Sequence, residues 1–311
     1  MIIKLIPFVP HDTKFDFFGH RFYALFVSFI IIGGAILSLS TRGLNFGIDF
    51  TGGTVMEIRV PNTPDLPDLR QKLHALDIGE VPIQEAGDAQ TLMIRLGEQE
   101  GGAEAEKAAV EKVRGALSQE FGDQIEWRRT EYVGPQVGKE LKVAGLIAII
   151  FSLVCIQAYI WIRFNWQYGV GAMLALIHDV MGILGLFSVT QMTFDLSTLA
   201  AILLVAGYSI NETIIIFDRI REALRKYRKW PMPEIINFSI NSTLSRTLMT
   251  SGSTILALFA LWLFGGMVIQ SFVSALFFGM LIGTHSSYFV SANTLYYLKL
   301  RRTPEGDAVT A

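Results

Sequence analysis

Two ionisable residues stand in stretches of this sequence that are otherwise apolar. Glu212 lies within the run 196–217, and Arg246 precedes a run that continues to residue 264. A charged side chain in membrane hydrocarbon costs at least about 3 kcal/mol, so such residues normally face a bundle interior or a wet pathway. A carboxyl group can also gain and lose a proton, and a guanidinium can pair with its ionised form. These residue types predict an ion-coupled membrane protein.

The spacing of neighbouring residues adds polar groups beside this pair. Tyr208 and Glu212 are one helical turn apart and share a face, Asn211 enlarges the patch, and Arg246 and Thr250 have the same spacing. If the two stripes face each other, a Glu212–Arg246 ion pair would offset much of the burial cost, and protonation of Glu212 would release Arg246. A permanent structural pair and an arginine extended to the lipid headgroups are the two other interpretations.

His178 and Asp179 form a second protonatable pair, about eleven residues and hence ~16 Å into the run 168–189. Consecutive helical residues diverge by about 100°, so only one of them can point squarely at a given neighbour. The pair could extend a proton relay, or it could satisfy local polar groups and hold helices in register. The predicted relay therefore comprises Glu212, Arg246, Asp179 and His178.

The composition excludes the ordinary soluble class. Hydrophobic residues make up 51% of the chain, charged residues only 17%, and mean hydropathy is +0.42. The net charge of −2 provides no basic field, so we expect no nucleic acid partner. The single cysteine, Cys155, cannot form an intrachain disulfide. The external part of the chain must therefore fold by its own core.

Apolar runs long enough to cross a bilayer of ~30 Å predict an α-helical membrane protein with six transmembrane helices. The first run is longer than a signal-peptide core and lacks a cleavage site, so we expect it to be retained. The last two runs are separated by little more than two glycines and predict a tight helical hairpin. The predicted spans are 22–39, 143–162, 168–189, 196–217, 247–264 and 267–288, the last five within 143–288.

Lysine and arginine set the expected orientation. They recur in the N-terminal segment 1–21, after the fourth span and in the tail 289–311, but are absent from the short loops 190–195 and 265–266. Both termini are therefore predicted to be cytoplasmic. Residues 40–142 are predicted to lie outside the cell membrane.

Periodicity within 40–142 predicts a small α+β domain. Alternating residues indicate strands at 55–60, 81–85, 91–96 and 125–132, and helical spacing indicates helices at 65–76 and 103–121. The β-α-β-β-α-β core near 55–133 is typical of a ferredoxin-like domain. No catalytic constellation is evident there, and a free strand edge could bind an extended chain by β-augmentation.

Several strings resemble the SecF family of the bacterial Sec translocon accessory complex SecDF. They are FGIDFTGGT at 46–54, VGPQVG at 133–138, ALIHDV at 175–180, GYSINETIIIFDRIRE at 207–222 and SRTLMTSGST at 245–254. The resemblance implies an RND-type half-transporter fold and use of the proton-motive force to help secreted polypeptides cross at SecYEG. It further implies SecD as the second half, with YajC and membrane lipids as other partners.

The same resemblance assigns Glu212 and Arg246 to proton transport. The family usually has aspartate where this chain has Glu212, which keeps the carboxyl but changes its reach. The coupled ion, proton or sodium, stays open, and no other cofactor is expected. Transporters of this type commonly comprise two similar halves with the coupling site between them. This chain contains one such half and no internal duplication, so we expect it to need a second half.

Three other functions are weighed against this one. A small RND-like proton-coupled exporter of lipids or small molecules would need a sizeable apolar cavity in the external region. A structural scaffold would tolerate loss of its intramembrane charges. An enzyme is not expected, because no Ser/His, paired-aspartate or HExxH pattern occurs in the spans.

Overall fold

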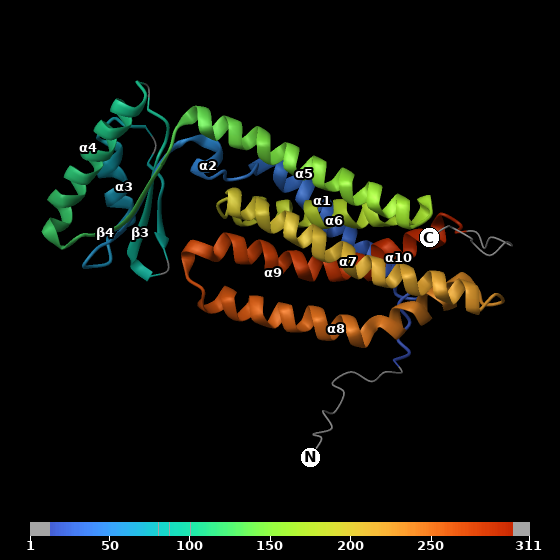
Figure 1. Ribbon diagram of the computed structural model, residues 1–311. Helices are drawn as coiled ribbons and strands as arrows, with labels where there is room; N and C mark the ends of the chain where they lie inside the picture. Colours follow the sequence, from blue (N-terminus) through green and yellow to red (C-terminus); the bar gives the residue numbers. More distant parts are fainter. Residues whose placement is uncertain (1–12, 80, 87, 100, 301–311) are drawn as a thin grey trace, which may run out of the picture.

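A computed structural model describes residues 13–79, 81–86, 88–99 and 101–300. It shows a sheet domain at one end of a helical bundle (Figure 1), called the external domain below because it lies outside the bundle. Six helices of the described residues are long and apolar enough to cross a membrane, which confirms the predicted multi-pass architecture. They are α1 Arg21–Arg42, α5 Pro135–Arg163, α6 Trp166–Thr190, α7 Leu196–Lys226, α8 Met232–Phe264, and a sixth composed of α9 Gln270–His285, the π-helical η3 Ser286–Ser291 and α10 Ala292–Tyr297.

The helix α8 begins at Met232, well before the predicted span 247–264. Pro231 is its N-cap, and Ile235, Ile236 and Ile240 are fully buried, while polar residues occupy the other face. This first half is amphipathic, and its apolar stripe packs in the same core as Ile220 on α7. A search for continuous apolar runs does not detect such a segment.

The sixth helix also continues beyond the predicted span 267–288. Ala292 and Leu295 are fully buried, so residues 289–297 are part of the bundle and not of a free tail. Residues 1–12 of the N-terminal segment and 301–311 of the tail lie outside the described residues.

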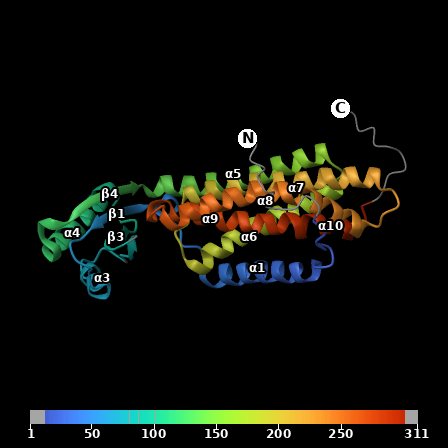
Figure 2. The same cartoon turned by 90° about the horizontal axis from the view of Figure 1, so that it is seen from below.

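The centre of the bundle is formed by α6, α7 and the sixth helix, in each of which 56% of the residues of the apolar stretch are buried. In α1, α5 and α8, which lie at the periphery, 17% of the residues of this stretch are buried. Figure 2 shows α1 along one side of the bundle, next to α6. The polar residues predicted on α6 and α7 are therefore carried by the most enclosed helices.

Small residues allow the closest helix contacts. A Cβ at Gly185 of α6 would lie 2.4 Å from Cβ of Ala35 on α1, and one at Gly279 of α9 would lie 2.9 Å from a methyl group of Val205 on α7. Neither distance is possible for real carbon atoms, so glycine is required at both positions. These two glycines thus mark points of close helix approach.

The external domain has the predicted ferredoxin-like order. Its elements are β1 Gly53–Arg59, α3 Leu66–His74, β2 Ile83–Ala86, β3 Asp88–Leu96, α4 Ala103–Phe121 and β4 Glu126–Val133, with a short 3₁₀ turn η1 Gly122–Gln124 before β4. The strands are antiparallel in the order β2-β3-β1-β4. The helices α3 and α4 cover the face away from the bundle (Figure 1), over a core that includes Met56, Leu92 and Leu117.

Two glycines join this domain to the bundle. Gly52 and Gly53 follow the short helix α2 Ile48–Thr51 and have φ of 75° and 108°, which side chains with a Cβ rarely adopt. A Cβ at Gly53 would lie 2.2 Å from the carbonyl oxygen of Leu96, and one at Gly52 would lie 2.9 Å from Cα of Pro135. The sequence FTGGT is therefore the point where β1 and α5 come together.

The loop between α6 and α7 is bonded to the external domain. Arg95 on β3 donates to Thr193 Oγ1 in this loop and, at 3.4 Å, to Asn45 Oδ1. Burial lowers the pKa of the Arg95 guanidinium, and the nearby charge of Asp195 acts in the opposite direction. A parallel bridge between Phe46 and Phe194 adds backbone bonds at the same place.

The contact at Gly185 can be tested by a larger side chain. Gly185→Val should push α1 from α6 and lower the free energy of unfolding by about 1–3 kcal/mol, because the packed interface cannot absorb the added volume. The measurement is thermal unfolding of the purified protein in detergent. Gly34→Val on α1 is the control, since a Cβ there meets no atom within 4 Å. Equal effects of the two substitutions would contradict the packing described.

Candidate functional site

Two carboxylates are enclosed at the centre of the bundle. The exposed fraction is 1% for Asp179 on α6 and 3% for Glu212 on α7. The two groups are close enough to interact electrostatically. Because like charges in a poorly hydrated site oppose each other, the ionisation of one carboxyl affects the ionisation of the other. The structure thus brings together two members of the predicted relay.

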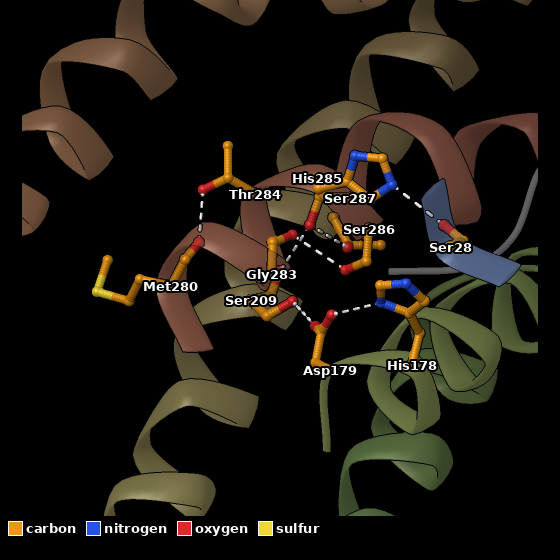
Figure 3. A network of polar contacts seen from close by, with 11 residues as sticks. Ser28, His178, Asp179, Ser209, Met280, Gly283, Thr284, His285, Ser286 and Ser287 are labelled. Carbon is orange, nitrogen blue, oxygen red and sulfur yellow. Dashed lines mark hydrogen bonds and ion pairs between the residues drawn. The ribbon is translucent and has the colours of Figure 1, made fainter. Parts of the chain in front are cut away.

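Asp179 is held from both sides (Figure 3). Ser209 on α7 donates to Asp179 Oδ2 at 2.5 Å, and His178 Nδ1 lies 3.4 Å from Asp179 Oδ1. Gly283 on α9 packs directly over this contact, since a Cβ there would lie 3.5 Å from Asp179 Oδ2 and 3.1 Å from Cβ of Ser209. The small residue at 283 therefore lets three helices meet at one carboxylate.

Glu212 has one bonded and one unbonded oxygen. Ser251 on α8 donates to Glu212 Oε1, and the hydroxyl of Tyr208 lies 3.3 Å from Ser251 Oγ. Glu212 Oε2 is buried and accepts no hydrogen bond of normal geometry from the described residues. This oxygen is the one available for a proton or an ion. Tyr208, predicted as a supporting residue, contacts the site through Ser251.

Further hydroxyl groups line the space between α7 and the sixth helix. Thr213 Oγ1 lies 3.0 Å from Ser287 Oγ, and Ser287 Oγ donates to the backbone oxygen of Ser209 at 3.3 Å. Ser287 belongs to the π-helical turn η3, and such turns often occur at functional sites. Hydroxyl groups both donate and accept, so they can pass protons as well as bind them.

His178 also faces a histidine of the sixth helix. The rings of His178 and His285 have centroids 5.9 Å apart, and His285 Nε2 lies 3.1 Å from Ser28 Oγ on α1. His178 is 4% exposed, and its Nε2 makes no hydrogen bond with the described residues. The sequence contained no signal for the Ser28–His285 contact, because these residues are far apart in the chain.

The expected ion pair between Glu212 and Arg246 is not formed among the described residues. Arg246 is exposed on α8, whereas Glu212 is enclosed. The face of α8 that meets α7 carries Thr243, Thr247 and Ser251, each a turn apart. Arg246 is rotated by about 100° from this stripe. The prediction that the stripe of Arg246 and Thr250 would face Glu212 was therefore wrong. The stripe that faces Glu212 carries Thr247 and Ser251, each one residue further along the chain.

The other two supporting residues also point outward. Thr250 shares the exposed face of Arg246 and bonds only to carbonyl groups of its own helix. Asn211 is exposed on α7, next to the enclosed Glu212. Sequence analysis missed Ser251, although its four-residue spacing from Thr247 could have indicated a shared face. Two sets of polar residues thus exist, one inside the bundle and one on its surface.

The enclosed set suits proton binding better than binding of a metal ion. In the part of the chain that the structure describes, no group of three His, Cys, Asp or Glu side chains is placed to hold a metal. Two coupled carboxyls, several hydroxyls and an imidazole pair can bind and transfer protons. The site can therefore exist in states that differ in charge inside a medium where charge is costly.

Comparison with known proteins identifies the family. The model described as "Protein export membrane protein SecD/SecF, C-terminal" matches residues 113–301, more than half of the chain, and the "SecD/SecF GG Motif" matches 37–60. The chain belongs to the SecD/SecF family. The longer match contains Asp179, Glu212 and Arg246, and the shorter one contains Gly52 and Gly53.

Relatives of this SecD/SecF chain extend over nearly its whole length. The protein translocase subunits SecF of Rickettsia bellii (strain OSU 85-389) and Rickettsia prowazekii (strain Madrid E) are 44% and 45% identical over 295 residues, covering 95% of this chain and 97% and 94% of theirs. The crystal structure of SecDF, a translocon-associated membrane protein from Thermus thermophilus, is 33% identical with a TM-score of 0.83. It matches 95% of this chain, which spans 40% of the SecDF chain.

The bond between Ser251 and Glu212 can be measured by a double-mutant cycle. Ser251→Ala removes the donor to Glu212 Oε1 and should lower the free energy of unfolding by about 1–3 kcal/mol, because a buried acceptor loses its partner. Combined with Glu212→Gln, the effect should be non-additive by about 0.5–3 kcal/mol. Unfolding in detergent is the measurement, and Ser253→Ala, on the exposed face, is the control. Strict additivity would show that the two groups do not interact.

Proposed function

We propose that this chain is a SecF-type subunit of the Sec protein-export machinery. Together with SecD it uses the proton-motive force to promote passage of secreted polypeptides across the cytoplasmic membrane at SecYEG. The observation that carries this proposal is the enclosed pair Asp179 and Glu212, in a chain related over almost its full length to translocase subunits. Placing two interacting acids at the centre of a membrane bundle costs free energy, and a purely structural subunit would have no need of these acids.

The proton is the coupled ion in this proposal. Glu212 offers a single unbonded oxygen, and the group that donates to its other oxygen is the hydroxyl of Ser251. A proton neutralises the carboxyl with one bond, whereas a sodium ion would need several oxygen ligands arranged around it. Replacement of sodium by choline in the transport buffer distinguishes the two ions directly.

The second half of the transporter would cover the polar surface of α7 and α8. Arg246, Thr250 and Asn211 are exposed on these two helices. Along α8, Arg246 lies between Ser242, which accepts a hydrogen bond from Arg219 at 2.8 Å, and Ser251, which donates to Glu212. Its depth in the bundle is therefore between the depths of Arg219 and Glu212. Polar groups at this depth are unfavourable in lipid. A SecD half is the partner that fits this surface.

The orientation follows from the distribution of charge. The end of α7 and the connection to α8 carry the cations Arg219, Arg221, Arg225, Lys226, Arg228 and Lys229. This end lies opposite the external domain (Figure 1), so it is cytoplasmic and the sheet domain is extracytoplasmic. A polypeptide emerging from SecYEG would meet the sheet domain first.

An exporter of lipids or drugs is less well supported. Between the open face of the sheet and the adjacent helix ends lies a cavity of about 450 Å³. Its lining includes the charged residues Asp49, Glu57, Arg95, Arg129, Glu131 and Asp195. Such a lining does not favour an apolar molecule, because the charges would have to be desolvated.

Neutralising the enclosed acids tests the function. Glu212→Gln and Asp179→Asn should each lower export driven by the proton-motive force at least tenfold in membrane vesicles, while SecD still co-purifies. The physical reason is that an amide can neither exchange a proton nor carry the negative charge of a carboxylate. Glu222→Gln, an exposed residue paired with Arg219, is the control and should leave export within twofold of wild type. Undiminished export in both site variants would refute the coupling role.

The position of SecD can be tested by cysteine cross-linking. In a Cys155→Ser background, Thr250→Cys should form a cross-link to SecD in native membranes, because this side chain faces outward. Ser251→Cys is the matched control, since that position is 2% exposed and should not react. Cross-linking of both or of neither would show that the exposed face of α8 is not the subunit interface.

A further inference from the structure

The histidine pair of the bundle has no part in the roles assigned so far to Glu212 and Arg246. His285 lies at the end of α9, where Ser28 of α1 contacts its Nε2 at 3.1 Å. Its ring is 5.9 Å from that of His178, which contacts Asp179 through Nδ1. Figure 3 shows the Ser28–His285 contact and the His178–Asp179 contact on the same side of the site, with Ser209 of α7 on the other side of Asp179. Together with the neighbouring rings, these contacts connect the peripheral helix α1 to the most enclosed carboxylate.

The two enclosed carboxyl groups need a compensating positive charge, and the histidines are close to them. His178 Nδ1 lies 3.4 Å from Asp179 Oδ1, and no lysine or arginine of the described residues pairs with Asp179 or Glu212. Without a cation, two enclosed carboxylates would share a poorly hydrated site with no compensating charge. Two imidazolium rings at 5.9 Å would in turn repel each other. One proton on the histidine pair avoids both costs.

The titratable groups that face the pair come from three elements. Asp179 adjoins both rings from α6, Glu212 interacts with Asp179 from α7, and Tyr288 of η3 interacts with Glu212. From α1, His285 is contacted by the hydroxyl of Ser28, which is 8% exposed, and by the backbone of Ala24. The histidines are thus the groups in this set that can supply positive charge.

We propose that His178 and His285 hold one proton between them as the counter-charge of Asp179, and that Ser28 orients His285 for this task. Asp179 then stays ionised, and Glu212 is the carboxyl that takes up and releases the transported proton. This inference rests on the proposed function and divides its roles. His178, His285 and Ser28 are positioning residues, because they act through Asp179.

Infrared spectroscopy of the full chain in lipid bilayers tests the proposal. In the wild type Asp179 should be ionised and should give no carbonyl band of a protonated carboxylic acid. The substitution Asp179→Asn should therefore remove no band from the wild-type spectrum. The double variant His178→Gln/His285→Gln keeps hydrogen-bonding groups but has no ring that can carry charge, so it should produce such a band, and adding Asp179→Asn should abolish it. In the His178→Gln background, His285→Lys restores a cation and should suppress the band. A merely structural histidine would not give this pattern.

A matched pair of serines on α1 tests the orienting contact. In the His178→Gln background, where His285 is the ring left to hold the proton, Ser28→Ala should produce part of the Asp179 band seen in the double variant. Ser38→Ala in the same background should produce none, although Ser38 is also 8% exposed and bonds across the same interface, to Ser188 at 2.8 Å. Absence of the band in the double variant, or its presence in wild type, would overturn the proposal.

The same variants separate this inference from the proposed function. His178→Gln/His285→Gln should lower proton-driven export at least tenfold, and His178→Gln/His285→Lys should recover at least half of wild-type export. If export is insensitive to Glu212→Gln while the infrared pattern is as expected, the proposed function fails and the charge assignment stands. If export depends on Glu212 but the Asp179 band never forms, the charge assignment fails alone.

Discussion

The structure depends on the enclosure of two interacting carboxylates where hydration is poor. Asp179 and Glu212 are almost inaccessible, and each ionised form must be stabilised by the protein itself. The hydroxyls of Ser209 and Ser251 serve this purpose, and the absence of a side chain at Gly283 lets the helices come close enough for them to do so. In this bundle the close packing of small residues is therefore what allows the buried carboxyl groups to receive hydrogen bonds.

The same helices are connected to the external domain. The loop that joins α6 to α7 is bonded to β3 through Arg95 and to the segment before α2 through Phe194. On the other side, Gly52 packs against Pro135 at the start of α5. Because the carboxylates lie on α6 and α7, a relative movement of these helices would be applied directly to the sheet. This arrangement suits a protein in which charge inside the membrane acts on a polypeptide outside it.

The sequence predicted the elements better than their faces. Six apolar runs and an alternation of strands and helices were sufficient for the bundle and the ferredoxin-like domain. The amphipathic start of α8 was missed, because half of its surface is polar. The stripe of Arg246 and Thr250 was assigned to the wrong side of this helix. A polar residue within an apolar run shows that some face is polar, but not whether that face meets a neighbouring helix or a missing subunit.

By itself the sequence determined the number of membrane-spanning helices, the order of elements outside the membrane and the identity of the titratable residues. These properties follow from local composition and periodicity, which each segment carries independently of its neighbours. Only the tertiary structure decided that Glu212 meets Ser251 and not Arg246, that Asp179 meets Ser209, and that His285 of the last helix meets Ser28 of the first. The reason is that a helix can be rotated by a fraction of a turn without any change in its composition, and packing against several other helices at once selects the rotation.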